Sequence, residues 1–171
     1  MFVGAAVLLV AAIAARLGDA PWLLTAALLL TPPLVSKRFF PDLLGRERRA
    51  RAWLPGIAVG LAFLAMVALR PDLARYALLT LLLSALPEEW FFRAWLQQEL
   101  GNDYRAVGLA SLAFAAIHGL MLSWRMAALV FLPSLLFGWL YLRYRSLLLV
   151  ALAHATANLA LRVVEVSGAL R

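Results

Sequence analysis

In the middle of an apolar run, the chain carries the stretch Pro87-Glu88-Glu89-Trp90-Phe91-Phe92-Arg93. Such interruptions are rare, because residues of the AVILMFWYC group make up 65% of the 171 residues. A soluble domain has roughly 45–50% of such residues on a similar count, and a fold of this size could not bury so much apolar surface. The composition therefore predicts an integral membrane protein, in which an ionisable group inside a helix is costly and marks a candidate functional site.

Seven apolar runs approach the ~20 residues that a membrane-spanning helix needs. By residue number they are 1–15, 21–35, 53–69, 76–100, 106–122, 126–142 and 147–164. The first run has no Lys or Arg before it, so we interpret it as a retained helix rather than a signal peptide. The pattern predicts an all-α integral membrane protein, with a single domain over residues 1–171 and about seven transmembrane helices.

Basic residues are concentrated in one long gap between the apolar runs, residues 36–52. This gap carries Lys37, Arg38, Arg46, Arg48, Arg49 and Arg51 against Asp42 and Glu47. Because positive charge stays on the cytoplasmic side of a membrane, we expect this loop and the amino terminus to be cytoplasmic and the carboxyl terminus to be external. Orientation in the membrane also explains the net charge of +7, so we expect no nucleic-acid partner.

In a helix, the two glutamates of the charged stretch point in different directions. Pro87 cannot donate a backbone hydrogen bond, which predicts a kink in this helix. Glu89 and Arg93 are four residues apart and share a helix face, so they can pair. Glu88 points about 100° away from Glu89 and is left mainly free, as a general base in a low-dielectric site requires. The alternative interpretation is an ion-pair network that only fixes helix packing.

Two further runs carry isolated polar side chains. His118 lies in the run 106–122, and His154 and Asn158 lie four residues apart on one face of the run 147–164. A purely structural interpretation makes His118 a packing group and makes His154 and Asn158 hydrogen-bonding groups between helices. Taken together, however, two carboxylates, two imidazoles and an amide on three helices are what water activation and oxyanion binding require.

Other intramembrane chemistries lack their residues in this sequence. There is no His-Glu-x-x-His zinc motif and no Gly-x-Ser-x-Gly nucleophile motif. All of the Asp residues fall between the apolar runs, which disfavours an aspartyl dyad. The chain has no Cys, which excludes disulfides, thiolate zinc sites and a Cys nucleophile.

The ordered set of motifs resembles the CPBP family, which comprises CAAX-processing endopeptidases of the Ras-converting type together with bacteriocin-processing and Abi proteins. The family shows Glu-Glu-x-x-x-Arg, then Phe-x-x-x-His, then His-x-x-x-Asn on successive helices. The matching residues are Glu88-Glu89 to Arg93, Phe114 to His118, and His154 to Asn158. The resemblance covers about residues 76–162, and residues 1–52 lie outside it. Ala94 stands where the family commonly has a glycine.

The resemblance implies a helical bundle around a polar catalytic cavity and a glutamic-type intramembrane endopeptidase. In this family pattern Glu88 and His118 activate a water, while Glu89 and Arg93 support the geometry. His154 and Asn158 are the implied oxyanion donors. Family members have also been called metalloproteases, so the alternative is a zinc ion held by Glu88, His118 and His154. We expect a site without a metal or other cofactor, because a third strong ligand is lacking.

The implied substrate is a membrane protein or peptide in the lipid bilayer. A CAAX substrate is a prenylated protein, which is mainly eukaryotic, whereas a chain rich in Ala, Leu and Arg is typical of a bacterial inner-membrane protein. Small bacterial relatives cleave carboxy-terminal sorting tags, which is the use that we expect here. Two other hypotheses remain: a non-catalytic immunity or scaffold protein of the same fold, and a small proton-coupled carrier.

Overall fold

The computed structural model describes residues 29–31 and 49–168, and every element in this part of the chain is helical. In chain order the elements are α3 (Arg49–Leu69), η2 (Pro71–Leu73), α4 (Ala74–Leu79), η3 (Thr80–Ala85), α5 (Leu86–Glu89), η4 (Trp90–Gln97), α6 (Tyr104–Met121), α7 (Trp124–Tyr144) and α8 (Leu147–Ser167). The expected all-α class is confirmed for these residues. The runs 1–15 and 21–35 and the loop 36–52 lie outside the described residues, except for residues 29–31 and 49–52.

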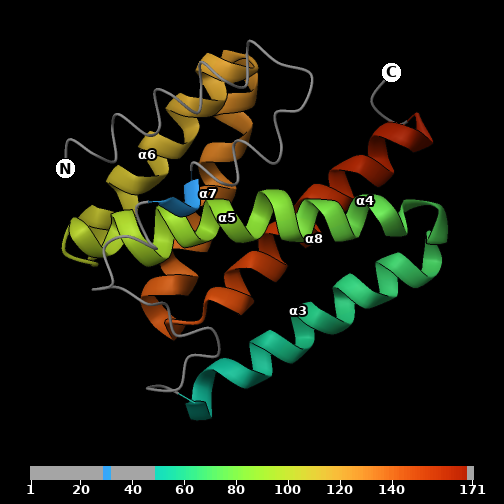
Figure 1. The fold of residues 1–171 in the computed structure, drawn as a ribbon, viewed down its shortest axis with the longest axis horizontal. Coiled ribbons are helices and arrows are strands. Elements are labelled where there is room, and N and C mark those ends of the chain that lie inside the picture. The colour runs from blue at the N-terminus through green and yellow to red at the C-terminus, as the bar shows by residue number, and fades with distance from the viewer. Residues whose placement is uncertain (1–28, 32–48, 169–171) are drawn as a thin grey trace.

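A sharp bend separates α3 from the helix that follows it. The chain direction bends by 107° at Arg70, and Figure 1 shows α3 and α4 diverging from one turn. Pro71 occupies the first turn of η2, where its missing N–H is tolerated. The Arg70 side chain donates hydrogen bonds of 2.9 and 2.7 Å to the two carboxylate oxygens of Asp72. A proline and a local ion pair thus mark the bend.

The helix after the bend is continuous from η2 to η4, but its hydrogen-bond pattern changes along its length. η3 and η4 are π-helical, and the α-helical turn α5 lies between them. Pro87, which the sequence predicted as a kink, lies in α5. Wider π turns are one way in which a helix adapts to a lost backbone donor, and they are frequent at functional sites. The charged stretch therefore begins in a short α-helical turn and ends in a π-helical segment.

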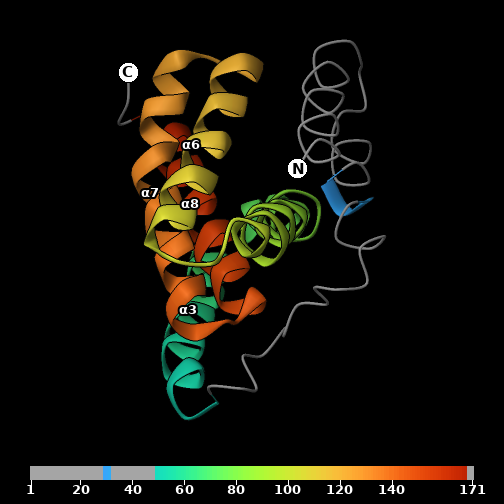
Figure 2. The ribbon, with the colours of Figure 1, turned by 90° about the vertical axis from the view of Figure 1, so that its left-hand side faces the viewer.

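The last three helices begin with side-chain caps. The capping residues are Asp103 for α6, Ser123 for α7 and Ser146 for α8, and each accepts a hydrogen bond from a backbone N–H in the first turn. α6 and α7 form a pair that lies side by side in Figures 1 and 2. Figure 2 shows the helix that contains α5 nearly end-on beside this pair. The charged stretch therefore crosses the face of the α6–α7 pair.

Only part of the expected set of spans is confirmed. Among the described residues, α6, α7 and α8 are each long and apolar enough to cross a membrane. The bent pair of residues 53–69 and 71–97 meets the same test only when its two limbs are taken together. This gives three spans, or up to four, where the sequence predicted a separate span for each limb. Glu88, Glu89 and Arg93 lower the apolar character of the second limb, and the bend interrupts the pair.

α8 lies at the centre of the described helices and packs against α3, α5 and α7. One apolar cluster joins it to α3 and α4 through Phe63, Ala77 and Ala155. A second, aromatic cluster joins η4 to α6 through the rings of Phe92 and Phe114. These two clusters hold together the helices that carry the three motifs.

Candidate active site

Glu89 and Arg93 form a buried ion pair at the site. Both side chains are completely buried, and Arg93 Nε lies 3.1 Å from Glu89 Oε2. This is the pairing that their spacing on one helix face predicted. Two charges removed from water are stable only when they are paired, so the pair ties these two side chains into one rigid unit.

His154 reaches the same carboxylate from α8. Its Nδ1 lies 2.8 Å from Glu89 Oε1, across 65 residues of sequence. Because an ionised carboxylate only accepts hydrogen bonds, this partner assigns the ring proton to Nδ1. The imidazole also stacks on Phe137 of α7, with ring centroids 5.3 Å apart. Glu89 and Phe137 together fix the ring and direct its other nitrogen, Nε2, away from Glu89.

Glu88 faces that second nitrogen. Its Oε2 atom lies 4.0 Å from His154 Nε2 and has no hydrogen-bond partner among the described residues. Its Oε1 atom accepts a hydrogen bond of 2.8 Å from Ser84 Oγ. A separation of 4.0 Å is too long for a direct hydrogen bond. One bridging water at about 2.8 Å from each atom would span this separation, and the Oε2 atom is buried.

Arg93 is held by α7 as well as by Glu89. Its Nη2 donates to Ser134 Oγ at 2.7 Å and to the backbone oxygen of Ser134 at 3.2 Å. Its guanidinium also lies 5.6 Å from the centre of the Phe114 ring. Ser134 is completely buried. The arginine therefore connects the first motif to α6 and α7.

His118 lies beside this network without a polar contact to it in the described part of the chain. Its Nδ1 donates a hydrogen bond of 2.9 Å to the backbone oxygen of Phe114, one turn earlier in α6. The Phe114 ring lies between the two histidines, 4.3 Å from His118 and 5.9 Å from His154 between centroids. The Nε2 atom of His118 is left for another partner. The structure thus places His154, rather than His118, next to Glu88.

Asn158 follows His154 by one turn of α8. Its side chain is half-buried, and no hydrogen bond of its amide is found among the described residues. Of the six candidate residues, the structure brings Glu88, Glu89, Arg93 and His154 into one network. His118 adjoins this network through an aromatic ring, and Asn158 lies on the same helix as His154.

Sequence reasoning missed Ser84 and Ser134. Ser84 precedes Glu88 by one helical turn, and this spacing alone would have indicated that the two side chains can contact. Ser134 lies 41 residues from Arg93, so only the packing of α7 against η4 reveals its role.

The donors for a metal ion are not grouped in this site. Among the described residues, no set of three or more His, Cys, Asp or Glu side chains is arranged to hold a metal ion. His154 directs Nδ1 to Glu89, and His118 directs Nδ1 to its own helix, so only the two Nε2 atoms are left as possible ligands. A metal ion held by Glu88, His118 and His154 would therefore use the Nε2 atoms of the two imidazoles.

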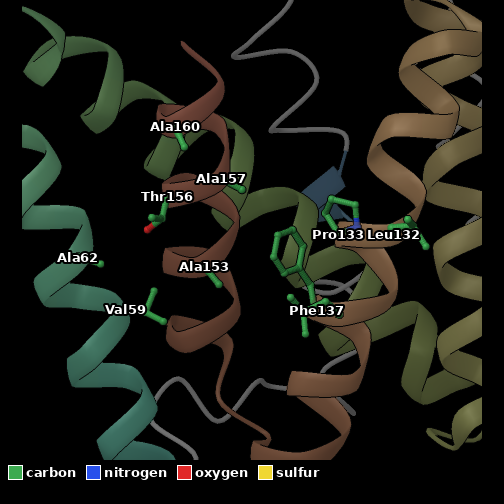
Figure 3. Close-up of a pocket in the computed structure, with 10 residues that line it drawn as sticks. Val59, Ala62, Leu132, Pro133, Phe137, Ala153, Thr156, Ala157 and Ala160 are labelled. Carbon is green, nitrogen blue, oxygen red and sulfur yellow. The ribbon is translucent and has the colours of Figure 1, made fainter. Parts of the chain in front are cut away.

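An apolar groove adjoins the network. It has a volume of about 580 Å³, and Figure 3 shows side chains of α3, α8 and α7 lining it in turn. Its lining residues are Val59, Ala62, Leu132, Pro133, Leu136, Phe137, Ala153, Thr156, Ala157 and Ala160. Phe137 lines the groove and also stacks on His154. The polar catalytic cavity that the family resemblance implied is not confirmed, because this groove is apolar.

The apolar helices and the buried network define a multi-pass membrane protein with an ionisable site between its helices. The family model described as type II CAAX prenyl endopeptidase Rce1-like matches residues 70–160, more than half of the 171 residues, and the chain belongs to this family. The match includes all six candidate residues, and it confirms the family resemblance drawn from the three motifs. No curated protein and no solved structure matches the chain.

Proposed function

We propose that the chain is an intramembrane endopeptidase that hydrolyses a peptide bond of a membrane-associated protein with water activated by Glu88. Its family supports a CAAX-type membrane protease. The observation that carries the mechanism is the Oε2 atom of Glu88, which lacks a hydrogen-bond partner among the described residues and lies 4.0 Å from His154 Nε2. A carboxylate oxygen with this freedom, next to a fixed imidazole, suits general-base catalysis.

In the proposed reaction, Glu88 takes a proton from a water as the water oxygen attacks the scissile carbonyl carbon. The C–O bond forms, the carbonyl oxygen becomes an oxyanion, and the proton then passes from Glu88 to the leaving amine as the C–N bond breaks. We propose that His118 accepts a hydrogen bond from the same water and so helps Glu88 to activate it. Its Nδ1–H is directed to the Phe114 carbonyl, so its Nε2 lone pair remains for that water.

The proposed oxyanion donors are His154 and Asn158. As an imidazolium, His154 donates Nδ1–H to Glu89 and offers Nε2–H to the oxyanion. The Asn158 amide, one turn further along α8, supplies the second donor. Donors that are held in place before the reaction stabilise the developing charge without reorganisation. The bond from His154 to Glu89 supports this requirement.

The proposed substrate reaches the site from within the membrane. The apolar groove of α3, α7 and α8 is lined in part by Phe137, whose ring stacks on His154. A substrate with a membrane-embedded segment next to its scissile bond fits this arrangement. We propose a carboxy-terminal sorting tag with one apolar helix as the substrate and the bacterial inner membrane as the location, with residues 36–52 on the cytoplasmic side.

The function is tested with purified protein in lipid vesicles and a panel of peptides that carry one transmembrane helix and a basic end. We expect one peptide to be cut at a single bond near the membrane boundary. In isotopically labelled water, the new carboxyl terminus should gain one labelled oxygen, which mass spectrometry detects. A folded protein that cuts none of the peptides, and binds one of them instead, would support the non-catalytic scaffold hypothesis.

Chelation provides a separate prediction. We expect cleavage to be unchanged after incubation with EDTA or ortho-phenanthroline, because the proposed water activation uses Glu88 and His118. Initial rates before and after chelation, followed by addition of zinc, provide the measurement. A loss of activity that zinc restores would favour the metal-dependent mechanism.

Substitution of Asn158 tests the oxyanion site. Asn158→Ala should lower kcat by about 10²–10³-fold and change KM little, as expected for a donor that acts mainly in the transition state. Asn158→Asp should be at least as damaging, because a carboxylate repels the developing oxyanion. The measurement is kcat and melting temperature on the same preparations. Lower thermal stability with an unchanged kcat would show that Asn158 only joins helices.

A further inference from the structure

We propose that Ser84 is a positioning residue that selects which carboxylate oxygen of Glu88 acts on the water. The inference rests on the proposed role of Glu88 as the base. Ser84 lies one turn before Glu88, in the π-helical segment η3. Its hydroxyl donates a hydrogen bond of 2.8 Å to Glu88 Oε1.

The direction of this hydrogen bond is informative. A serine inside a helix commonly donates to a backbone carbonyl one turn earlier, as Thr156 does to Leu152 at 2.7 Å. Ser84 instead donates forward to a side chain. The hydroxyl is thus used to orient a carboxylate and not to satisfy the backbone of its own helix.

The hydrogen bond makes the two oxygens of Glu88 unequal. Oε1 is engaged by Ser84, whereas Oε2 has no hydrogen-bond partner in the described part of the chain and faces His154 Nε2. A glutamate side chain has several rotatable bonds and, without an anchor, would populate other rotamers. With Oε1 anchored, Oε2 is held where a water between Glu88 and His154 can give up its proton.

Anchoring should affect the chemical step more than substrate binding. Small misplacements of a reacting group reduce the rate strongly. Among the described residues, Ser84 is not one of the residues that line the groove, and its hydroxyl is bonded to Glu88 rather than to a proposed oxyanion donor. A hydrogen bond to a charged group contributes about 1.5–3 kcal/mol, and at about 1.4 kcal/mol per factor of ten this corresponds to about 10–100-fold in rate.

The test compares Ser84→Ala, Ser84→Thr and the control Ser167→Ala with the unchanged protein. Ser84→Ala should lower kcat by about 10–100-fold with an unchanged KM. Ser84→Thr retains the hydroxyl and should recover most of the lost kcat. Ser167 also donates within its own helix, to the Val164 carbonyl at 2.8 Å, but lies exposed at the end of α8, so Ser167→Ala should leave kcat unchanged.

A second measurement does not depend on turnover. The infrared carboxylate band of Glu88, obtained as the difference between the unchanged protein and Glu88→Gln, should shift in Ser84→Ala and return in Ser84→Thr. A full kcat and an unshifted band in Ser84→Ala would overturn the inference, as would a loss of kcat that Ser84→Thr does not restore. If Glu88→Gln itself keeps full turnover, the proposed base is wrong, and the infrared band still reports whether Ser84 orients that carboxylate.

Discussion

Glu88→Gln should lower kcat by about 10²–10⁴-fold, the usual contribution of a general base, while the protein inserts and purifies like the unchanged one. The amide has nearly the shape of the carboxylate and can still accept the hydrogen bond from Ser84. It cannot take a proton from water. The variant therefore removes the chemistry and preserves the packing, and the measurement is single-bond cleavage of the tag peptide in vesicles.

The matched control is Glu99→Gln. Glu99 is exposed and lies just beyond η4, outside the network. The same change of carboxylate to amide there should leave kcat and melting temperature unchanged. Near-full turnover of Glu88→Gln would show that another group activates the water, and His118, the proposed second group on that water, would become the first candidate.

Arg93→Met should destabilise the protein by about 3–5 kcal/mol, the usual effect of removing one partner of a buried ion pair. The substitution leaves the completely buried Glu89 carboxylate without its guanidinium. It also removes the two hydrogen bonds that the Arg93 guanidinium donates to Ser134 of α7. The measurement is thermal or denaturant unfolding in one detergent, followed by the fluorescence of the tryptophans.

Two further variants test whether the loss of stability comes from the burial of the ion pair. Arg162 pairs with Glu165 at 3.1 Å, but both side chains are 46% exposed, so Arg162→Met should change stability by less than about 1 kcal/mol. The double variant Arg93→Met with Glu89→Met removes both buried charges and should recover part of the loss. Equal effects of Arg93→Met and Arg162→Met would contradict a buried pair.

The features that depend on local spacing were predicted from the sequence. The run 106–122 became the helix Tyr104–Met121, and the run 147–164 became Leu147–Ser167, because each is a long apolar segment between polar caps. The pair of Glu89 and Arg93 followed from their separation by one helical turn. The family was also recognised from the order of its motifs.

The features that depend on packing between helices were not predicted. The sequence gives no sign that Glu89, rather than Glu88, binds His154, because Glu89 and His154 lie 65 positions apart. It also does not show that the Phe114 ring separates His118 from His154. The π-helical segments depend on how several backbone donors adjust around Pro87. The sequence predicts a span on each side of Arg70, whereas the two limbs meet the length and composition test for a span only when they are taken together.

The bend at Arg70 has a consequence for how the chain enters the bilayer during synthesis. The limb that carries Glu88, Glu89 and Arg93 does not meet the length and composition test for a span by itself, whereas the two limbs together do. Because charges inside the membrane are costly unless they are paired, we expect such a limb to stay at the insertion machinery until its neighbour can shield it. The two limbs should therefore leave the translocon as one helical hairpin. The ion pair that prepares the site for catalysis then also neutralises the charges that would otherwise oppose insertion.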